Sequence, residues 1–105
     1  MGLVGPGSSL RCDMTIKLTD FQISLHAALQ QLFIAGGRQI TWHIRGEKES
    51  FYYGSTHDSA IEIWLYEDEA ECRFGDFHRL CERPDFESTE HLKNYFIEVV
   101  RSRLG

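Results

Sequence analysis

The sequence predicts an α+β domain of two layers, with an antiparallel sheet of four strands covered on one face by an N-terminal and a C-terminal helix. Apolar residues recur at helical spacing near both ends of the chain and alternate with polar residues in the segments between them. These middle segments are short and separated by polar turns, which favours strands that follow one another in an antiparallel meander. A chain of 105 residues has room for one such domain.

The first 13 residues read as a flexible leader or tag-like tail because they are rich in Gly, Pro and Ser. The single domain then covers residues 14–105. Its first segment, "MTIKLT" at 14–19, alternates apolar and polar residues and is a candidate for a fifth strand.

A helix is predicted over residues 20–35. Thr19 followed by Gln22 fits a capping box, and Gly36 with Gly37 supplies a C-terminal stop. The apolar stripe expected to face the core consists of Phe21, Leu25, Ala28, Leu29 and Leu32.

Four strands are predicted next, over residues 40–45, 51–55, 60–66 and 70–78, with Gly75 marking a bulge or break in the last of them. The side chains expected to point toward the helices are Ile40, Trp42, Ile44, Phe51, Tyr53, Ile61, Ile63, Leu65, Ala70, Cys72 and Phe74.

A second helix is predicted over residues 88–103, after Pro84 ends the strand region. Ser88 is a suitable N-cap, and Glu90 lies in the first turn, where a negative charge is favourable. Its predicted buried stripe is Leu92, Tyr95, Phe96 and Val99.

Charge is distributed unevenly along the chain. Residues 58–90 hold eleven Asp or Glu and three Arg, a net charge of −8, which leaves +3 for the remainder of a chain whose total is −5. A nucleic-acid partner would require a basic stripe, so none is expected, and no apolar run is long enough for a membrane span. Three cysteines are too few for a disulfide framework, and we expect a cytoplasmic protein with reduced thiols.

Four carboxylates, those of Glu67, Asp68, Glu69 and Glu71, follow the third predicted strand. They lack the spacing of a calcium loop, and neighbouring side chains on a strand point to opposite faces, so we expect no metal there. Two interpretations stay open: a hydrated hairpin turn, or an acidic surface that recognises a partner.

Two chemical alternatives involve the thiols. Cys72, His78 and Cys81 have residue types suited to zinc but lack a fourth ligand and the paired spacing of zinc motifs, so neither a metal nor a cofactor is expected. A small metal-dependent or thiol enzyme would use His57, Asp58, His78 and Cys81. No local catalytic signature surrounds these residues, so the leading interpretation is non-catalytic.

The sheet face away from the helices is predicted to carry His43, Arg45, Tyr52, Glu62, Trp64 and Tyr66. An exposed aromatic face of this kind suits a partner or a second copy of the chain, because Trp, Tyr and Arg are enriched at interface hot spots. A reversed register, with Trp64 in the core, is the alternative.

Two segments, "AIEIWLYEDEAECRF" and "DFESTEHLKNYF", resemble small bacterial proteins of the toxin-immunity type. The resemblance covers the C-terminal half and implies a non-catalytic protein that neutralises a cognate partner by binding it, often through an acidic surface. The leading hypothesis is therefore an immunity- or inhibitor-type module for a basic protein, in which Glu67, Asp68, Glu69 and Glu71 steer the partner. Its candidate anchors are Trp64, Tyr66 and Phe74, and a structural homodimer would use the same aromatic face.

Overall fold

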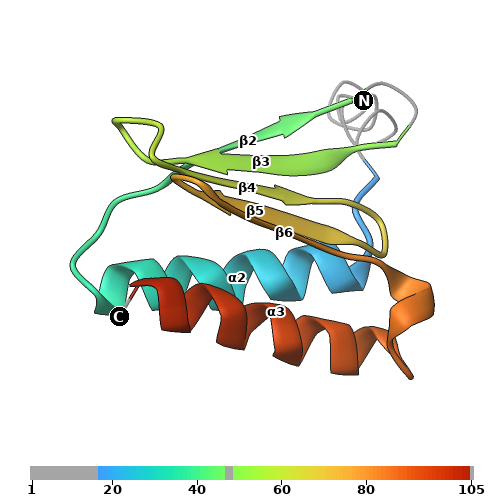
Figure 1. Cartoon of the computed structure of the whole chain (residues 1–105). Helices are drawn as coiled ribbons and strands as arrows, with labels where there is room; N and C mark the ends of the chain where they lie inside the picture. The colour runs from blue at the N-terminus through green and yellow to red at the C-terminus, as the bar shows by residue number, and fades with distance from the viewer. Residues whose placement is uncertain (1–16, 47–48, 105) are drawn as a thin grey trace, which may run out of the picture.

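The computed structural model describes residues 17–46 and 49–104. Helix α2 (Asp20–Ala35) precedes five strands, and helix α3 (Thr89–Leu104) follows them after a short 3₁₀ turn, η1 (Arg83–Asp85). The strands are β2 (Thr41–Arg45), β3 (Phe51–Ser55), β4 (Ile61–Leu65), β5 (Ala70–Phe74) and β6 (Phe77–Cys81). The two-layer α+β architecture predicted from the sequence is confirmed (Figure 1).

The strands form one antiparallel sheet in the order β2-β3-β4-β5-β6. The fourth strand was predicted to cover residues 70–78, but the chain reverses at Gly75 and pairs Phe74 with Phe77. The end of that predicted strand is therefore the start of a fifth strand, β6. Gly75 has a φ of 62°, a left-handed conformation that glycine adopts without steric cost. The alternative fifth strand at 14–19 lies largely outside the described residues, as does the predicted leader, and residues 17–19 are not in a strand.

Both helices begin and end within one residue of the predicted bounds. Thr19 and Gln22 form the capping box at the start of α2, and the Ser88 hydroxyl accepts a hydrogen bond from the His91 amide at the start of α3. Within the described ranges, neither helix is long and apolar enough to cross a membrane.

The two helices lie side by side under one sheet face and run in the same direction (Figure 1). This follows from the strand count, because five antiparallel strands separate α2 from α3 and return the chain to the end from which it started. Both helix N-termini therefore lie at the end of the molecule that also carries the β4–β5 turn and η1.

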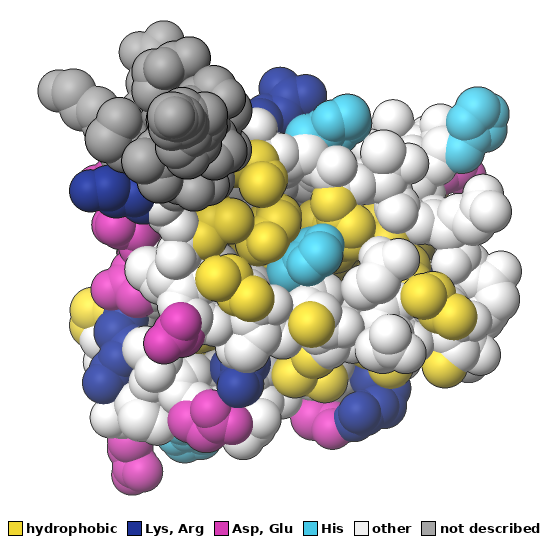
Figure 2. Space-filling view, turned by 180° about the vertical axis from the view of Figure 1, so that it is seen from behind, with side chains coloured by type: hydrophobic (Ala, Val, Ile, Leu, Met, Phe, Trp, Pro, Cys, Tyr) yellow, Lys and Arg dark blue, Asp and Glu magenta, His cyan; other side chains and the backbone are white. Residues whose placement is uncertain are grey.

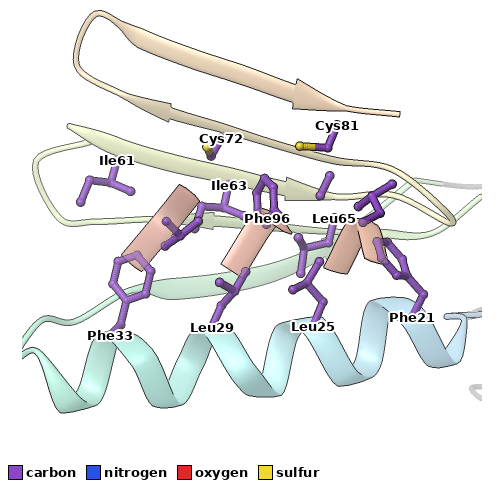
Figure 3. Close-up of a cluster of buried hydrophobic side chains, with 13 residues drawn as sticks. Phe21, Leu25, Leu29, Phe33, Ile61, Ile63, Leu65, Cys72, Cys81 and Phe96 are labelled. Atoms are coloured by element: carbon purple, nitrogen blue, oxygen red, sulfur yellow. The ribbon is translucent and has the colours of Figure 1, made fainter. Parts of the chain in front are cut away.

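The core lies between the helices and the three strands β4, β5 and β6. Figure 3 shows Phe21, Leu25, Leu29 and Phe33 of α2 in a row that points at the sheet, with Phe96 of α3 beside them. The sheet contributes the fully or almost fully buried side chains Ile61, Ile63, Leu65, Ala70, Cys72 and Cys81. Burial of this apolar surface is the main favourable term in folding.

The faces of β3 are opposite to those predicted. The register pairs Tyr52 with Leu65 and Gly54 with Ile63, so Tyr52 points toward the helices and Phe51 and Tyr53 point away. The physical reason is the Trp42 ring, which lies over Gly54: a Cβ at position 54 would be 2.6 Å from it. Only glycine fits opposite the indole, and this fixes the register of the strand.

The helix stripes also differ in detail from the prediction. Tyr95 is exposed rather than buried, whereas Phe33 and Val100, which the predicted stripes omit, are completely buried. The two helices pack against each other as well as against the sheet, so the buried face of each includes residues that contact the neighbouring helix.

One polar side chain, Gln22, is completely buried and connects the two layers. Its amide nitrogen donates to the Ser50 carbonyl at 2.8 Å and to the Leu65 carbonyl at 3.0 Å, and its amide oxygen accepts from the Thr19 amide at 2.7 Å. The start of α2 is thus joined to the entrance of β3 and the end of β4.

We expect Gln22→Leu to lower the free energy of unfolding by ~2–4 kcal/mol, because two buried carbonyl groups lose their donor. Gln31→Leu is the matched control on the exposed side of α2 and should change it by less than about 0.5 kcal/mol. Urea denaturation of both variants measures the difference, and equal midpoints would contradict the role assigned to Gln22.

Candidate functional site

No helix or strand of the described ranges lies over the sheet face opposite the helices (Figure 1). We call it the outer face. The register of the strands assigns to it the residues Thr41, His43, Arg45, Phe51, Tyr53, Ser55, Glu62, Trp64, Glu71, Arg73, His78 and Leu80. The predicted positions of His43, Arg45, Glu62 and Trp64 are confirmed, and Tyr52 was wrongly assigned to this face.

Aromatic rings occupy the middle of the outer face. Tyr53 and Trp64 are cross-strand partners whose ring centres are 5.6 Å apart, and the Arg45 guanidinium lies 5.0 Å from the centre of the Tyr53 ring. Phe51 and Tyr66 form a second pair, 5.2 Å apart. All four rings are half-buried against their neighbours, so each presents part of its surface to solvent in a fixed position.

A hydrogen-bonded ion pair lies beside these rings. The Glu62 carboxylate accepts from the Tyr53 hydroxyl at 2.5 Å and from the Arg73 Nε at 2.9 Å. The Tyr53 hydroxyl and the Arg73 guanidinium hold the pKa of Glu62 below its ordinary value, and the same carboxylate raises the pKa of Tyr53. This pair holds the Tyr53 ring in place against Trp64.

Glu71 belongs to a second pair rather than to a free acidic cluster. Its carboxylate lies 2.5 Å from His78 Nε2 and accepts from the Tyr66 hydroxyl at 3.3 Å. Partial burial and the nearby negative charges of Glu71 and Glu69 raise the pKa of Tyr66. Tyr66 and Trp64 therefore both lie beside Glu71 in the structure.

The other three acidic residues form the β4–β5 turn at the rim of this face. Glu67 and Asp68 are exposed, while Glu69 is half-buried; burial and the charges of Glu82, Asp68 and Glu71 raise its pKa. The Glu67 carbonyl accepts a hydrogen bond from the Thr19 hydroxyl at 3.0 Å. The turn is thus attached to the N-terminus of α2, whose partial positive charge favours carboxylates nearby.

Phe74 is separated from the other predicted anchors. It pairs with Ile61 and Phe77 and packs against the core on the helix side of the sheet. Because Trp64 lies on the outer face, one partner cannot contact both rings on the same surface. Phe74 has a packing role in the described structure.

The residues of the thiol-enzyme alternative do not converge. His57 and Asp58 lie in the β3–β4 turn, His78 lies on the outer face, and Cys81 is 1% exposed on the helix side. Burial raises the pKa of Cys81 and that of Cys72, the latter to about 12, which disfavours the thiolate needed for a nucleophile. Among residues 17–46 and 49–104, no group of three or more His, Cys, Asp or Glu is placed to hold a metal ion.

His57 and Asp58 do lie beside an open hollow of about 500 Å³, which Gly37, Arg38 and Gln39 line from the other side. Asp58 accepts hydrogen bonds from the Thr56 hydroxyl at 2.8 Å and from the Ala60 amide at 3.1 Å, and these donors lower its pKa. The carboxylate is therefore engaged in shaping its own turn, as is common for Asp in turns.

A smaller apolar surface lies where β2 passes the flank of α2. His26 stacks on Tyr52 with ring centres 4.2 Å apart, and Trp42 Nε1 donates to Gln30 at 2.9 Å. Ile44 and Ile34 remain 45% and 56% exposed beside them. Figure 2, seen from behind, shows hydrophobic side chains gathered across the middle of the surface with a histidine among them. Burial lowers the pKa of His26.

No family model matches the chain, and neither a curated protein nor a solved structure is similar enough to it to count as a match.

The sequence analysis missed Phe51, Tyr53 and Arg73 as members of the outer face. The signal for the first two is Gly54, since a glycine within a strand often marks a place where a large side chain crosses, here that of Trp42. Arg73 carries the opposite charge directly across from Glu62, but this pairing can be recognised only when the register of β4 and β5 is known.

The lowered pKa of Glu62 predicts how the stability of the outer face depends on pH. A carboxylate with a folded-state pKa below its ordinary 4.5 stabilises the fold above that pH, and the contribution is lost as pH falls through the folded-state value. We therefore expect Glu62→Gln to be less stable than the parent at pH 7, with the difference shrinking below pH ~4.

Urea midpoints at pH 7, 4 and 3 measure this difference. Glu87→Gln, which replaces an exposed carboxylate outside the network, is the control and should differ little from the parent at each pH. A difference between Glu62→Gln and the parent that is independent of pH would show that the carboxylate charge does not stabilise the pair.

Proposed function

We propose that this chain is a non-catalytic protein-binding module of the immunity or inhibitor type, which binds a basic partner protein through the outer face and the adjacent acidic turn. The observation that carries the proposal is a five-stranded sheet with one face that no helix or strand of the described ranges covers, and with the paired rings of Tyr53 and Trp64 near the centre of that face. A cytoplasmic location and an inhibitory role belong to this proposal.

The aromatic centre supplies the anchors. Trp and Tyr are the residues most often found at interface hot spots, because they bury a large area at a small cost in side-chain entropy. Here that cost is reduced further, since Glu62 and Arg73 already hold Tyr53 beside Trp64. A flat surface prepared in this way suits a protein better than a small molecule, which needs a concave pocket.

The acidic turn supplies the electrostatic attraction. Glu67 and Asp68 are exposed at the rim of the outer face and form no ion pair with the described residues, so their negative charge is available to attract a basic partner. Charges at a rim raise the rate of association more than the affinity. The resemblance of residues 60–74 and 85–96 to toxin-immunity proteins supports the same kind of partner.

The test begins with affinity capture from a lysate of the source organism, comparing the parent chain with Trp64→Ala. A true partner should be retained by the parent and lost by the variant, and binding kinetics then follow with the purified partner. We expect Trp64→Ala to accelerate dissociation by about tenfold or more, because it removes an anchor. Ile34→Ala, an exposed apolar change on α2, should leave both rates unaltered.

In the same measurement, the double variant Glu67→Gln, Asp68→Asn should slow association by about threefold at low salt and flatten its salt dependence. The matched control is Asp76→Asn, Glu98→Gln, which changes the net charge equally at exposed sites away from the turn. Equal effects of the two double variants would mean that net charge alone, and not the acidic turn, attracts the partner.

Two further outcomes contradict the proposal. One is a captured protein that binds Trp64→Ala as tightly as the parent. The other is a dimer in sedimentation analysis that Trp64→Ala dissociates, which would show that the outer face binds a second copy of the chain instead.

A further inference from the structure

A second cluster of charge and aromatic surface lies at the opposite face and edge of the sheet. Phe77 and Arg79 are on the helix side of edge strand β6, and Arg103 reaches them from the last turn of α3. The Arg103 Cζ atom is 3.6 Å from the centre of the Phe77 ring, and the Arg79 Cζ atom is 5.6 Å from the same centre. Arg79 also donates a hydrogen bond to the Tyr95 hydroxyl.

Two guanidinium groups therefore share one phenyl ring. Attraction between a cation and the face of an aromatic ring accounts for the position of each group, but it does not neutralise either positive charge. Both charges also act on the same buried thiol, since Arg79 and Arg103 each lower the pKa of Cys72 against the larger, opposite effect of burial.

The other charged groups nearby do not neutralise the pair. Among the described residues, no carboxylate lies within 4.0 Å of Arg79 or Arg103, whereas Arg73 pairs with Glu62 and Arg101 pairs with Glu98. Asp76, which precedes Phe77, forms no ion pair with either arginine. A pair of arginines that lie near one ring and have no carboxylate within 4.0 Å among the described residues thus differs from Arg73 and Arg101, which are both paired.

We propose that Arg79 and Arg103, held by Phe77, form a binding site for an oxyanion, either a carboxylate or a phosphate group. Guanidinium groups present planar sets of N–H donors that match both anions, and they stay protonated throughout the accessible pH range. Arg103 is exposed and Arg79 is half-buried at the sheet edge, so an anion can reach both from solvent. The site is independent of the outer face, which lies on the other side of the sheet.

The experiment is a titration of the ¹⁵N-labelled chain, followed through the side-chain Nε–Hε signals of its arginines. Inorganic phosphate and a blocked tetraglutamate peptide are added separately, with NaCl adjusted to keep the ionic strength constant. We expect the signals of Arg79 and Arg103 to shift together and to saturate with at least one of the two probes.

Arg103→Gln should weaken the saturable binding by about fivefold or more, since charge-assisted contacts to the anion are lost. Arg101→Gln is the matched control, because it removes the same charge from the same helical turn while leaving the stacked pair intact. Should Arg103→Gln fail to fold, Arg103→Lys keeps the charge without the planar donor set and should still weaken binding.

The two probes distinguish the source of the anion. Saturation by phosphate alone assigns the site to a phosphate group, saturation by the peptide alone assigns it to a carboxylate of an acidic segment, and saturation by both assigns it to oxyanions in general. Linear shifts with both probes, or equal weakening by Arg103→Gln and Arg101→Gln, would overturn the proposal. Neither result bears on the outer face, which is tested through Trp64.

Discussion

The hydrogen bonds of Gln22 are the constraint on which the rest of the structure depends. A buried amide that donates to the Ser50 and Leu65 carbonyls fixes the start of α2 against two strands at once. Buried polar groups are costly unless their hydrogen bonds are satisfied, so only one position of the helix along the sheet is acceptable. The row of apolar side chains from Phe21 to Phe33 then meets β3 and β4 in a single register.

The odd number of strands has a consequence for charge. Because both helices begin at the same end, their partial positive charges act together there, beside the β4–β5 turn and η1. The carboxylates in this part of the chain are therefore partly accounted for by the fold. The exposed position of Glu67 and Asp68 at the rim of the outer face, however, is not required by the helices.

The two faces of the sheet carry different chemistry. On the outer face, each carboxylate near the rings is paired, Glu62 with Arg73 and Glu71 with His78, so the pairs orient aromatic surface rather than attract charge. On the helix side of β6, two guanidinium groups lie near the Phe77 ring, and no carboxylate of the described residues is within 4.0 Å of either.

The sequence by itself determined both helices and the first four of the five strands, whereas β6 was expected to be the end of the fourth strand. Helical periodicity and local caps defined α2 and α3, because these signals act over a few neighbouring residues. The Thr19 hydroxyl accepts a hydrogen bond from the Gln22 amide, and the Ser88 hydroxyl accepts one from the His91 amide. Alternation also favoured Trp64 on the outer face, because Ile61, Ile63 and Leu65 form the more apolar side of β4, and the structure excludes the reversed arrangement.

Only the tertiary structure decided which side chains of β3 point toward the helices and which lie on the outer face beside Trp64. Phe51, Tyr52 and Tyr53 are all aromatic, so the local sequence contains no alternation from which to choose a face. The choice was made by the Trp42 ring on the neighbouring strand, which needs Gly54 opposite it and so turns Tyr53 toward Trp64. In the same way, Phe77 and Arg103 are far apart in the chain, and only the packing of α3 under β6 brings the guanidinium onto the ring.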